Sequence, residues 1–298
     1  MLTRVAGRPS SSPGPWLLFV VCALACLGAT ASAAGAPAKR MLVVCSPGSP
    51  GDTQQAQPTM DAFASAVETA AKLAPGSLGA VYYESAEGGL PRLKQTDAAL
   101  ALVPLPFLLR YGEELGLHPR LEAVPEWGSV EIWSLVAKKG SAARAESLSG
   151  WEVTGSPGYA PDFIRRALLS DWGALPADTT ITFTARAVAA LRRAASGEKV
   201  AVLLDRTQTA ALSSLPFGPD LEVVHRSRPF PSAFLCTIGD RLPAADTAAL
   251  TKILPLLHES ESGKEILKEM RLEKFLPLDD KRLDEIRRSV SPGAGSAR

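Results

Sequence analysis

The turn at residues 155–161, GSPGYAP, has the residue types of an anion-binding site at the start of a helix. Ser156 supplies a hydroxyl, Gly158 permits close approach of a ligand to the backbone, and Tyr159 could place an aromatic ring beside it. The first amides of a helix lack internal partners, and the helix dipole makes this end positive. The two prolines of the turn donate no hydrogen bond, however, which leaves few amide donors. The alternative is a strand–helix turn that binds no ligand.

Further candidate ligand-binding residues stand where predicted strands end. Ligands of open α/β sheets gather in the crevice outside the carboxyl ends of the strands. The candidates at such positions are Ser46, Tyr83, Phe107, Thr184 and Asp205. For Thr184 and Asp205 the alternative is that the side chain caps the helix that follows.

Motifs for catalysis, metal binding and nucleotide binding are missing from the sequence. The three histidines are far apart, and no HExxH or Cys-x-x-Cys motif occurs. The sequence also lacks a Gly-x-Ser-x-Gly elbow, a Walker-type phosphate loop and a dinucleotide-binding glycine pattern. We therefore expect no enzymatic activity, no metal and no cofactor. The near balance of 32 basic and 31 acidic residues argues against nucleic acid as a partner.

Strand and helix patterns alternate along the chain and must position these residues. Apolar runs that end at turn residues predict strands at 40–46, 78–85, 97–104, 130–139, 179–184, 199–205, 220–227 and 232–239, and one just before the 155–161 turn. Apolar residues at three- and four-residue spacing predict helices at 58–73, 106–116, 185–197, 244–260, 262–270 and 279–290, and one just after that turn. This alternation predicts an α/β protein in which helices flank the sheets.

The N-terminus has the three parts of a secretory signal peptide. A basic start is followed by an uncharged apolar run at 16–29 and by small residues up to Ala33. We therefore assign residues 1–33 to a signal peptide and expect an exported, periplasmic protein. Retention of the segment as an anchor helix is the alternative. A lipid anchor is not expected, because Ala23 rather than leucine stands three residues before Cys26.

Two cysteines, Cys45 and Cys236, follow the predicted signal peptide. They could form a disulfide in an oxidising compartment, or remain buried free thiols, since each stands in an apolar run. The sequence leaves both possibilities open. The last residues, 291–298, have the sequence SPGAGSAR and are expected to form a disordered tail.

Several segments resemble the phosphonate-binding class of periplasmic solute-binding proteins of ABC transporters. They are TDAALALVPLPFLL, EIWSLVAKKGSAARAESLSGWEVTGSPG, SGEKVAVLLDRTQTAAL, VVHRSRPFPSAFLCTIGDRLP and GKEILKEMRLEKFLPLDDKRLDEI. The resemblance lies in the order of elements and in short motifs, and it covers nearly all of residues 40–288. It implies the type 2 periplasmic-binding fold, with two lobes that are each a mostly parallel sheet flanked by helices. Lobe 1 would comprise residues 40–135 and 235–290, and lobe 2 residues 140–230.

The resemblance also implies a function. Two crossing segments, near 134–142 and 226–236, would join the lobes, and a small solute would bind between them. A phosphonate-like anion is one candidate for that solute. Phe107 and Asp205 match an aromatic and an acidic position of the family, and in related proteins the acid contacts an amine of the ligand. The partner would be the permease of a membrane transporter, and the protein itself a monomer.

Three alternatives stay open at this stage. The chain could be an exported ligand-sensing module for a membrane receptor, an enzyme on the same fold, or a relative that binds no ligand. Glu126 and Trp127, which stand near a predicted crossing segment, could contact a solute or simply pack.

Overall fold

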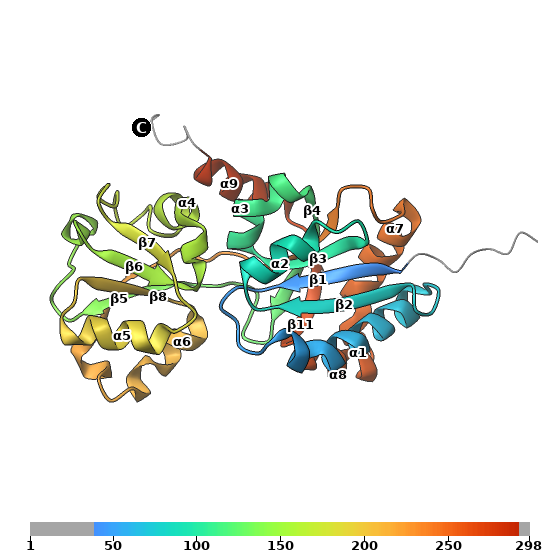
Figure 1. Ribbon diagram of the computed structural model, residues 1–298, viewed down its shortest axis with the longest axis horizontal. Helices are drawn as coiled ribbons and strands as arrows, with labels where there is room; N and C mark the ends of the chain where they lie inside the picture. The colour runs from blue at the N-terminus through green and yellow to red at the C-terminus, as the bar shows by residue number, and fades with distance from the viewer. Residues whose placement is uncertain (1–38, 292–298) are drawn as a thin grey trace, which may run out of the picture. The chain divides into compact units, whose positions relative to one another are not determined.

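Two β-sheets organise residues 39–291, the part of the chain that the computed structural model describes (Figure 1). These residues all fall within one unit of the chain. The predicted signal peptide, residues 1–33, lies outside them, as does the predicted tail apart from Ser291. Among the described residues no helix combines the length and the apolar character needed to cross a membrane.

The first lobe contains a six-stranded sheet with the strand order β11-β4-β10-β3-β1-β2. Its strands are β1 (Arg40–Cys45), β2 (Leu78–Tyr83), β3 (Ala98–Pro104), β4 (Leu117–Pro125), β10 (Ala233–Ile238) and β11 (Leu272–Pro277). Its helices are α1 (Thr53–Ala71), α2 (Ala86–Leu93), α3 (Leu105–Leu115), α7 (Ala244–Ile253), α8 (Glu261–Glu269) and α9 (Asp280–Val290), with a 3-10 segment, η6 (Leu254–Glu259), after α7.

The second lobe contains a five-stranded sheet with the order β7-β6-β8-β5-β9. Its strands are β5 (Ser134–Lys138), β6 (Glu152–Gly155), β7 (Thr180–Phe183), β8 (Val200–Leu204) and β9 (Leu221–Arg226). Its helical segments are η1 (Ala145–Leu148), η2 (Ser156–Tyr159), α4 (Pro161–Phe163), η3 (Ile164–Leu168), α5 (Ala187–Ser196), α6 (Arg206–Ala211), η4 (Leu212–Ser214) and η5 (Gly218–Asp220). Among them η3 is a π-helix and the other η segments are 3-10 helices.

The two-lobed α/β architecture agrees with the prediction, but each sheet is mixed rather than mostly parallel. In the first sheet β1 pairs in parallel with β2 and β3, whereas β10 and β11 form antiparallel ladders. In the second sheet β5 runs antiparallel to both of its neighbours. The reason is the connectivity: β5 and β10, the strands that enter each lobe from a crossing segment, run opposite to the βαβ units of that sheet, whereas β4 and β9, which lead out of the lobes, run with them.

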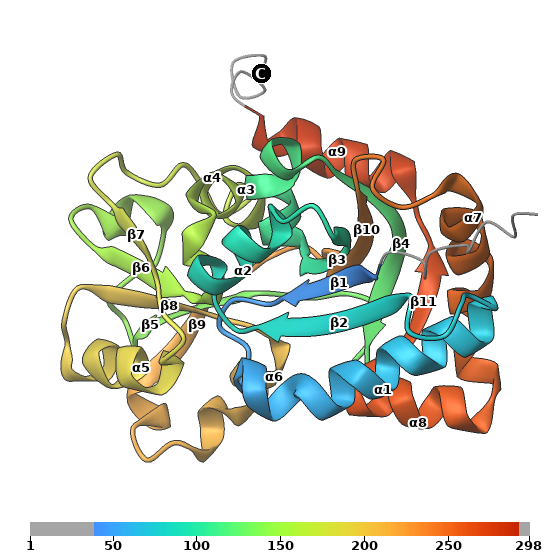
Figure 2. The same cartoon turned by 45° about the vertical axis from the view of Figure 1, so that its right-hand side comes forward.

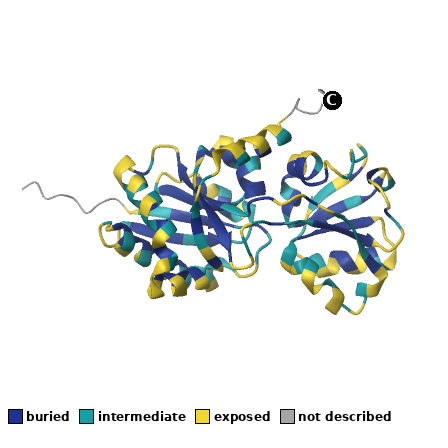
Figure 3. Ribbon diagram, turned by 180° about the vertical axis from the view of Figure 1, so that it is seen from behind, coloured by how far each residue is buried: buried dark blue, intermediate teal, exposed yellow. Residues whose placement is uncertain are grey.

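Helices cover both faces of each sheet, because apolar side chains alternate along the strands. In β1, Leu42 and Val44 face a core with α1, α7 and α8, while Val43 and Cys45 face a second core with α2, α3 and α9. Figure 2 shows α1 and α8 along one side of the first sheet and α3 and α9 on the other. The second core continues into the second lobe, and α5 packs on that lobe's other face. Exposed residues lie on the outer surfaces of the helices (Figure 3).

The helix α2 and the strands β4 and β11 were not expected from the sequence, nor were the short 3-10 segments η1, η4 and η5. The α2 sequence AEGGLPRL contains residues that disfavour helices, yet the Ser85 hydroxyl accepts a hydrogen bond from the Gly88 N–H at 3.2 Å and caps it. Within β4, Pro119 stands where the register against β10 shifts, which is a place where a strand tolerates proline. The helix predicted at 244–260 becomes 3-10 at Leu254, next to the predicted kink at Pro255.

The two lobes are joined by segments at residues 126–133 and 227–232. They are hydrogen-bonded to each other: the Glu131 N–H donates to the Phe230 carbonyl at 2.7 Å, and the Phe230 N–H donates to the Glu131 carbonyl at 2.9 Å. The first crossing was expected near 134–142, but residues Ser134–Lys138 form β5 in the second sheet. The second was expected near 226–236 and lies within that range.

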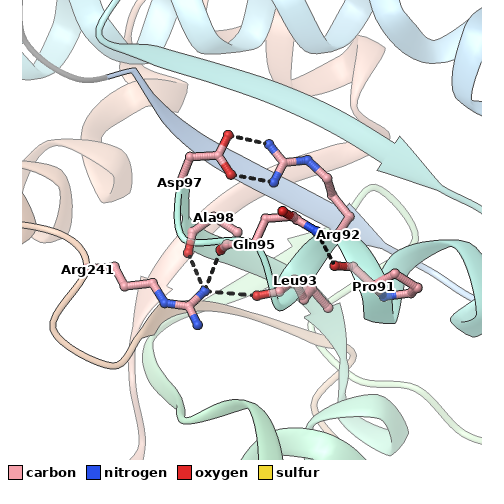
Figure 4. Close-up of polar contacts among 7 residues, drawn as sticks. All are labelled: Pro91, Arg92, Leu93, Gln95, Asp97, Ala98 and Arg241. Carbon is pink, nitrogen blue, oxygen red and sulfur yellow. Dashed lines mark hydrogen bonds and ion pairs between the residues drawn. The ribbon is translucent and has the colours of Figure 1, made fainter.

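An arginine holds the far ends of β3 and β10 together. Nη1 of Arg241 donates to the carbonyls of Leu93, Gln95 and Ala98 at 2.8–3.0 Å, and Arg92 forms a bidentate pair with Asp97 beside it (Figure 4). These contacts fix the turn between α2 and β3 to the turn after β10. The opposite ends of the same two strands border the candidate site.

Candidate functional site

A cavity of about 110 Å³ is formed where both lobes meet the crossing segments. The β1–α1 loop, the β3–α3 junction, both crossing segments, the η2 turn and the end of β8 contribute to it. Its lining residues are Ser46, Pro47, Ser49, Pro104, Leu105, Pro106, Glu131, Trp133, Ser156, Pro157, Tyr159, Phe163, Asp205, Phe230, Pro231 and Ser232. Loops at the carboxyl ends of the strands β1, β3, β6 and β8 therefore build most of the wall, as in other open α/β sheets.

Half of the residues predicted to bind a ligand line this cavity. The η2 turn brings Ser156 and Tyr159, the β1–α1 loop brings Ser46, and the residue after β8 brings Asp205. Asp205 also caps α6, because its Oδ1 accepts a hydrogen bond from the Gln208 N–H at 2.7 Å. The two roles considered for Asp205 are thus compatible: one oxygen caps the helix while the side chain borders the cavity.

The other four predicted residues lie outside the lining. Phe107 is fully buried and packs its ring 4.9 Å from that of Tyr111 and 6.3 Å from that of Tyr159. Tyr83 packs beside Gly88 and Gly89 of α2. The hydroxyl of Thr184 accepts a hydrogen bond from the Arg186 N–H at 3.1 Å, just before α5.

Gly158 has a structural reason to be glycine. A Cβ at this position would collide with the carbonyl group of Thr182, so the turn packs directly against β7. Glycine is needed here because the backbone of the turn lies against the backbone of β7. The sequence had instead suggested that a ligand approaches the backbone at this glycine.

Six polar or aromatic residues of the lining were not among the predicted ones: Ser49, Glu131, Trp133, Phe163, Phe230 and Ser232. Glu131 and Trp133 belong to the same crossing segment as Glu126 and Trp127, which had been considered instead. The first crossing lies earlier in the chain than the expected 134–142, and the sequence pattern assigns Glu131 and Trp133 to a strand over 130–139 instead. No sequence signal marks Ser232, since its position depends on how the second crossing passes the first.

Glu131 is buried in the hinge region, with only 7% of its surface exposed. Its Oε1 accepts a hydrogen bond from the Arg206 N–H at 2.8 Å, and its Oε2 accepts one from Trp127 Nε1 at 3.3 Å. Burial raises the pKa of Glu131 above its ordinary 4.5, although the Arg206 N–H acts in the opposite direction. Burial likewise raises the pKa of Asp205 above 3.8, against hydrogen bonds from the start of α6.

Serine hydroxyls supply the remaining polar groups of the wall. The Oγ atoms of Ser46 and Ser49 lie 2.7 Å apart and share a hydrogen bond. The hydroxyl oxygen of Ser232 is buried and has no hydrogen-bond partner among the described residues. A buried hydroxyl without a partner is costly, so Ser232 is available to bind a polar group in the cavity.

The lobes touch each other at the mouth of the cavity. The Tyr159 ring stacks on Tyr111 of α3 at 6.4 Å, and burial keeps the pKa of the Tyr159 phenol well above its ordinary 10. Gly48 of the β1–α1 loop approaches Ser156 so closely that a Cβ on Gly48 would lie 2.7 Å from that of Ser156. The arrangement is therefore a closed one, in which the first lobe covers the η2 turn of the second.

Metal ligation and a disulfide find no support between residues 39 and 291. No group of three or more His, Cys, Asp or Glu side chains that could hold a metal ion occurs in that part of the chain. Cys45 and Cys236 are both free and buried. Burial raises the pKa of the Cys45 thiol to about 12 and that of Cys236 further, so neither thiol is reactive in the folded protein.

Two α/β lobes that close over a cavity at a pair of crossing segments define a periplasmic-binding type of fold. The chain belongs to the family of periplasmic substrate-binding proteins of ABC phosphonate transporters, because the model of that family matches residues 124–283, more than half of its length. Membership agrees with the resemblance found in the sequence. The family consists of substrate-binding proteins that work with membrane transporters, not of enzymes.

Solved structures share the fold at low sequence identity. The chain is similar to XAC2383 from Xanthomonas citri bound to ATP, with 16% identity, a TM-score of 0.64, and coverage of 85% of this chain and 97% of that chain. It is also similar to PhnD1 from Prochlorococcus marinus in complex with methylphosphonate, with 15% identity, a TM-score of 0.57, and coverage of 84% and 97%. A binding protein component of an ABC phosphonate transporter from Pseudomonas aeruginosa matches at 15% identity and a TM-score of 0.56, with coverage of 84% and 85%. No curated protein sequence matches the chain.

Proposed function

We propose that this protein is an exported solute-binding protein that closes over one small solute and delivers it to the permease of an ABC importer. The observation that carries the proposal is the cavity between the lobes, which both lobes and both crossing segments line in a chain of this family. The signal-peptide pattern of residues 1–33 supports export to the periplasm. We further propose that the protein acts as a monomer.

The volume of the cavity limits the size of the solute. A volume of about 110 Å³ corresponds to only a few water molecules, at roughly 30 Å³ each in the liquid. Drug-sized ligands occupy pockets of about 300–1,000 Å³. The space between the lobes therefore suits a solute the size of methylphosphonate, which PhnD1 binds, better than one the size of ATP, which XAC2383 binds.

The proposed contacts come from both lobes. Ser46 and Ser232 would hold the solute from the first lobe and the second crossing, and Ser156, Tyr159 and Asp205 from the second lobe. Phe107 and Gly158 would act indirectly, by supporting Tyr159 and the η2 turn. Tyr83 and Thr184, predicted from strand ends, have no contact with the cavity in the closed arrangement.

Closure would follow a hinge movement about the two crossing segments. The two lobes, residues 40–125 with 233–290 and residues 134–226, would move as units on either side of residues 126–133 and 227–232. A solute that contacts both lobes binds the closed state more tightly than the open one, and so shifts the population toward closure. The permease would then recognise the closed conformation of the protein.

The site would bind its solute without converting it. The lining holds two carboxylates but no nucleophile with an adjacent base, and the thiols lie elsewhere in buried positions. Mass spectrometry of a solute recovered after long incubation with the protein should therefore find it unchanged. Turnover by the purified protein would contradict this part of the proposal.

Thermal unfolding of the purified protein tests solute capture. The protein is first unfolded and refolded, so that any solute that co-purified is removed. A solute at 100 times its Kd should stabilise the fold by about 2.7 kcal/mol, which is a rise in Tm of roughly 5–10 °C for a protein of this size.

The variant Ser232→Leu fills the cavity from a wall position and should abolish that rise. Ser213→Leu is the matched control, because Ser213 is exposed in η4 and away from the cavity. A full rise in Tm with Ser232→Leu, or loss of it with Ser213→Leu, would show that the solute binds elsewhere.

A further inference from the structure

The wall of the cavity is acidic. Glu131 and Asp205 both line it, while no lysine, arginine or histidine is among the lining residues of the described chain. Neither carboxylate takes part in an ion pair within residues 39–291. Their hydrogen-bond partners are the uncharged N–H groups of the Arg206 and Gln208 backbone and of the Trp127 indole. The negative charge at this wall is therefore held in place but not neutralised by a direct partner.

The guanidinium groups of the arginines that contact Glu131 and Phe230 are directed elsewhere. Arg206 donates through Nη1 to the Trp127 carbonyl at 3.5 Å and through Nη2 to the Val130 carbonyl at 3.3 Å. Arg228 is exposed and lies 4.6 Å from the centre of the Phe230 ring. Neither residue reaches the lining. Their charges weaken the negative potential from outside the cavity, but they offer no hydrogen bond to an anion inside it.

The backbone of the wall is also unsuited to an anion. Five of the sixteen lining residues are prolines, which have no N–H group: Pro47, Pro104, Pro106, Pro157 and Pro231. Seven more already donate their N–H to protein acceptors: Ser46, Ser49, Leu105, Glu131, Trp133, Asp205 and Phe230. An anion cradle needs convergent backbone amides, and most of the amides around this cavity are missing or in use.

Aromatic rings complete the wall. Trp133, Tyr159, Phe163 and Phe230 all line the cavity. The face of an aromatic ring attracts a cation, and a ring beside a carboxylate is a frequent binding site for alkylated ammonium groups. Burial of unpaired carboxylates is costly, and a bound cation removes that cost.

We propose that the solute is a compact organic cation, an amine or a methylated ammonium, held by Glu131 and Asp205 against the aromatic rings, and that a free phosphate or phosphonate anion is not the cargo. This inference rests on the proposed function, since it names the chemical class of the solute that the same cavity captures. It differs from the phosphonate-like anion that the family resemblance had suggested.

Three probes of the same tetrahedral shape separate the effect of charge from that of shape. Tetramethylammonium, inorganic phosphate and methylphosphonate are all tetrahedral and have the same number of non-hydrogen atoms. Isothermal titration calorimetry on the refolded protein should detect binding of tetramethylammonium and none of the two anions. Asp205→Asn should weaken the binding of tetramethylammonium by about tenfold or more, because it removes one of the two charges.

The choice of Asp205→Asn keeps the fold intact. Asparagine caps a helix as well as aspartate does, so the start of α6 is preserved. Asp279→Asn is the matched control: Asp279 caps α9 through the Arg282 N–H at 3.1 Å and lies outside the lining, so this variant should leave the affinity unchanged. Glu131→Gln is a second variant, with an expected loss of the same order.

The outcomes separate the two proposals. If phosphate or methylphosphonate binds, and Asp205→Asn leaves that binding unchanged or strengthens it, the cation inference is wrong while solute capture stands. Equal affinity of wild type and both variants for tetramethylammonium would also overturn the inference. If no probe of either charge binds, and intact-protein mass spectrometry of the protein before refolding finds no retained solute, the proposed function fails and the inference fails with it.

Discussion

At the scale of single residues, the two carboxylates of the cavity determine how solute binding responds to pH. Burial raises the pKa values of both Glu131 and Asp205, and the charge of Asp205 raises the pKa of Glu131 further. The backbone N–H and the guanidinium charge of Arg206 partly oppose the rise in the pKa of Glu131. A bound cation favours the ionised form of both groups, so its binding releases protons.

The affinity for tetramethylammonium should therefore fall as the pH is lowered through the raised pKa values of the pair. The fall should begin at a pH above the ordinary 4.5 of a glutamate, because protonation of the solute-free site competes with the cation. Calorimetric titrations from about pH 7 down to about pH 5 measure it, and Asp205→Asn should make the dependence shallower. An anion would bind more tightly as the pH falls, so an affinity that rises or stays constant on acidification contradicts this prediction.

Residue types at strand ends indicated part of the candidate site, and the structure shows why only part. Ser46, Ser156, Tyr159 and Asp205 follow strands of the two sheets whose carboxyl ends face the cavity, and a strand end can be recognised from local sequence alone. Ser232 follows no strand end of that kind. It borders the cavity because the Leu105 N–H donates to its carbonyl at 3.0 Å, which joins segments far apart in the sequence.

At the scale of elements, the strands that carry the site depend on contacts at their far ends. Arg241 satisfies three backbone carbonyls in the turn between α2 and β3, and does so from the turn after β10 (Figure 4). Leu93, Gln95 and Ala98 supply those carbonyls. Without the guanidinium group these carbonyls lose a charged hydrogen-bond donor. The contact that joins the end of β10 to the start of β3 is lost with it.

Arg241→Ala should lower the free energy of unfolding by about 1.5–3 kcal/mol, the usual contribution of hydrogen bonds to a charged group. Chemical denaturation measured by circular dichroism gives this value. Arg144→Ala is the control: Arg144 is exposed, and its nearest carboxylate oxygen, on Glu146, is 3.9 Å away, so its removal should cost little. Equal losses in the two variants would mean that the carbonyl contacts of Arg241 do not stabilise the fold.

The sequence did not predict the helix and the strands whose residues disfavour the structure that they form. Gly88, Gly89 and Pro91 argue against a helix at α2, but a Cβ on Gly89 would collide with the Cys45 sulfur, so a small residue is required there. Packing against β1 thus overrides the helix propensity of the segment. In β4, Pro119 is accommodated by a register shift that depends on the partner strand. Elements with regular apolar spacing were predicted better: α5 was predicted within a few residues of both ends, whereas α1 begins at Thr53, before the predicted start at Pro58.

At the scale of the whole molecule, the closed arrangement depends on close contact between the β1–α1 loop and the η2 turn. Gly48 has a φ of +86°, and a Cβ there would meet the Ser156 Cβ at 2.7 Å, well below the roughly 3.5–4.0 Å of an ordinary carbon contact. Tyr159 and Phe183 pack beside this contact, with ring centres 6.1 Å apart. A larger residue at position 48 would therefore clash with Ser156 and push the two lobes apart.

Gly48→Ala should favour the open state and weaken solute binding by about tenfold, since the closed state becomes less populated. Gly51→Ala is a matched control: Gly51 has a similar φ of +96°, but no atom lies within 4 Å of the position of its Cβ. Both variants should lose similar stability from the backbone strain, and only Gly48→Ala should lose affinity and show a larger radius of gyration in small-angle scattering. Equal affinities in the two variants would show that closure at this contact is not required for binding.

The sequence by itself determined the class of the protein, because that class is encoded by local patterns. Apolar periodicity and turn residues define the alternating strands and helices, and the short motifs along residues 40–288 define the family. The tertiary structure alone decided the mixed sheets, the position of the crossing segments and the chemical character of the cavity. The charge of a site depends on which side chains remain unpaired and which amides are already hydrogen-bonded. Those properties arise from contacts between segments far apart in the chain, such as Glu131 with Arg206 and Leu105 with Ser232, and no local pattern encodes them.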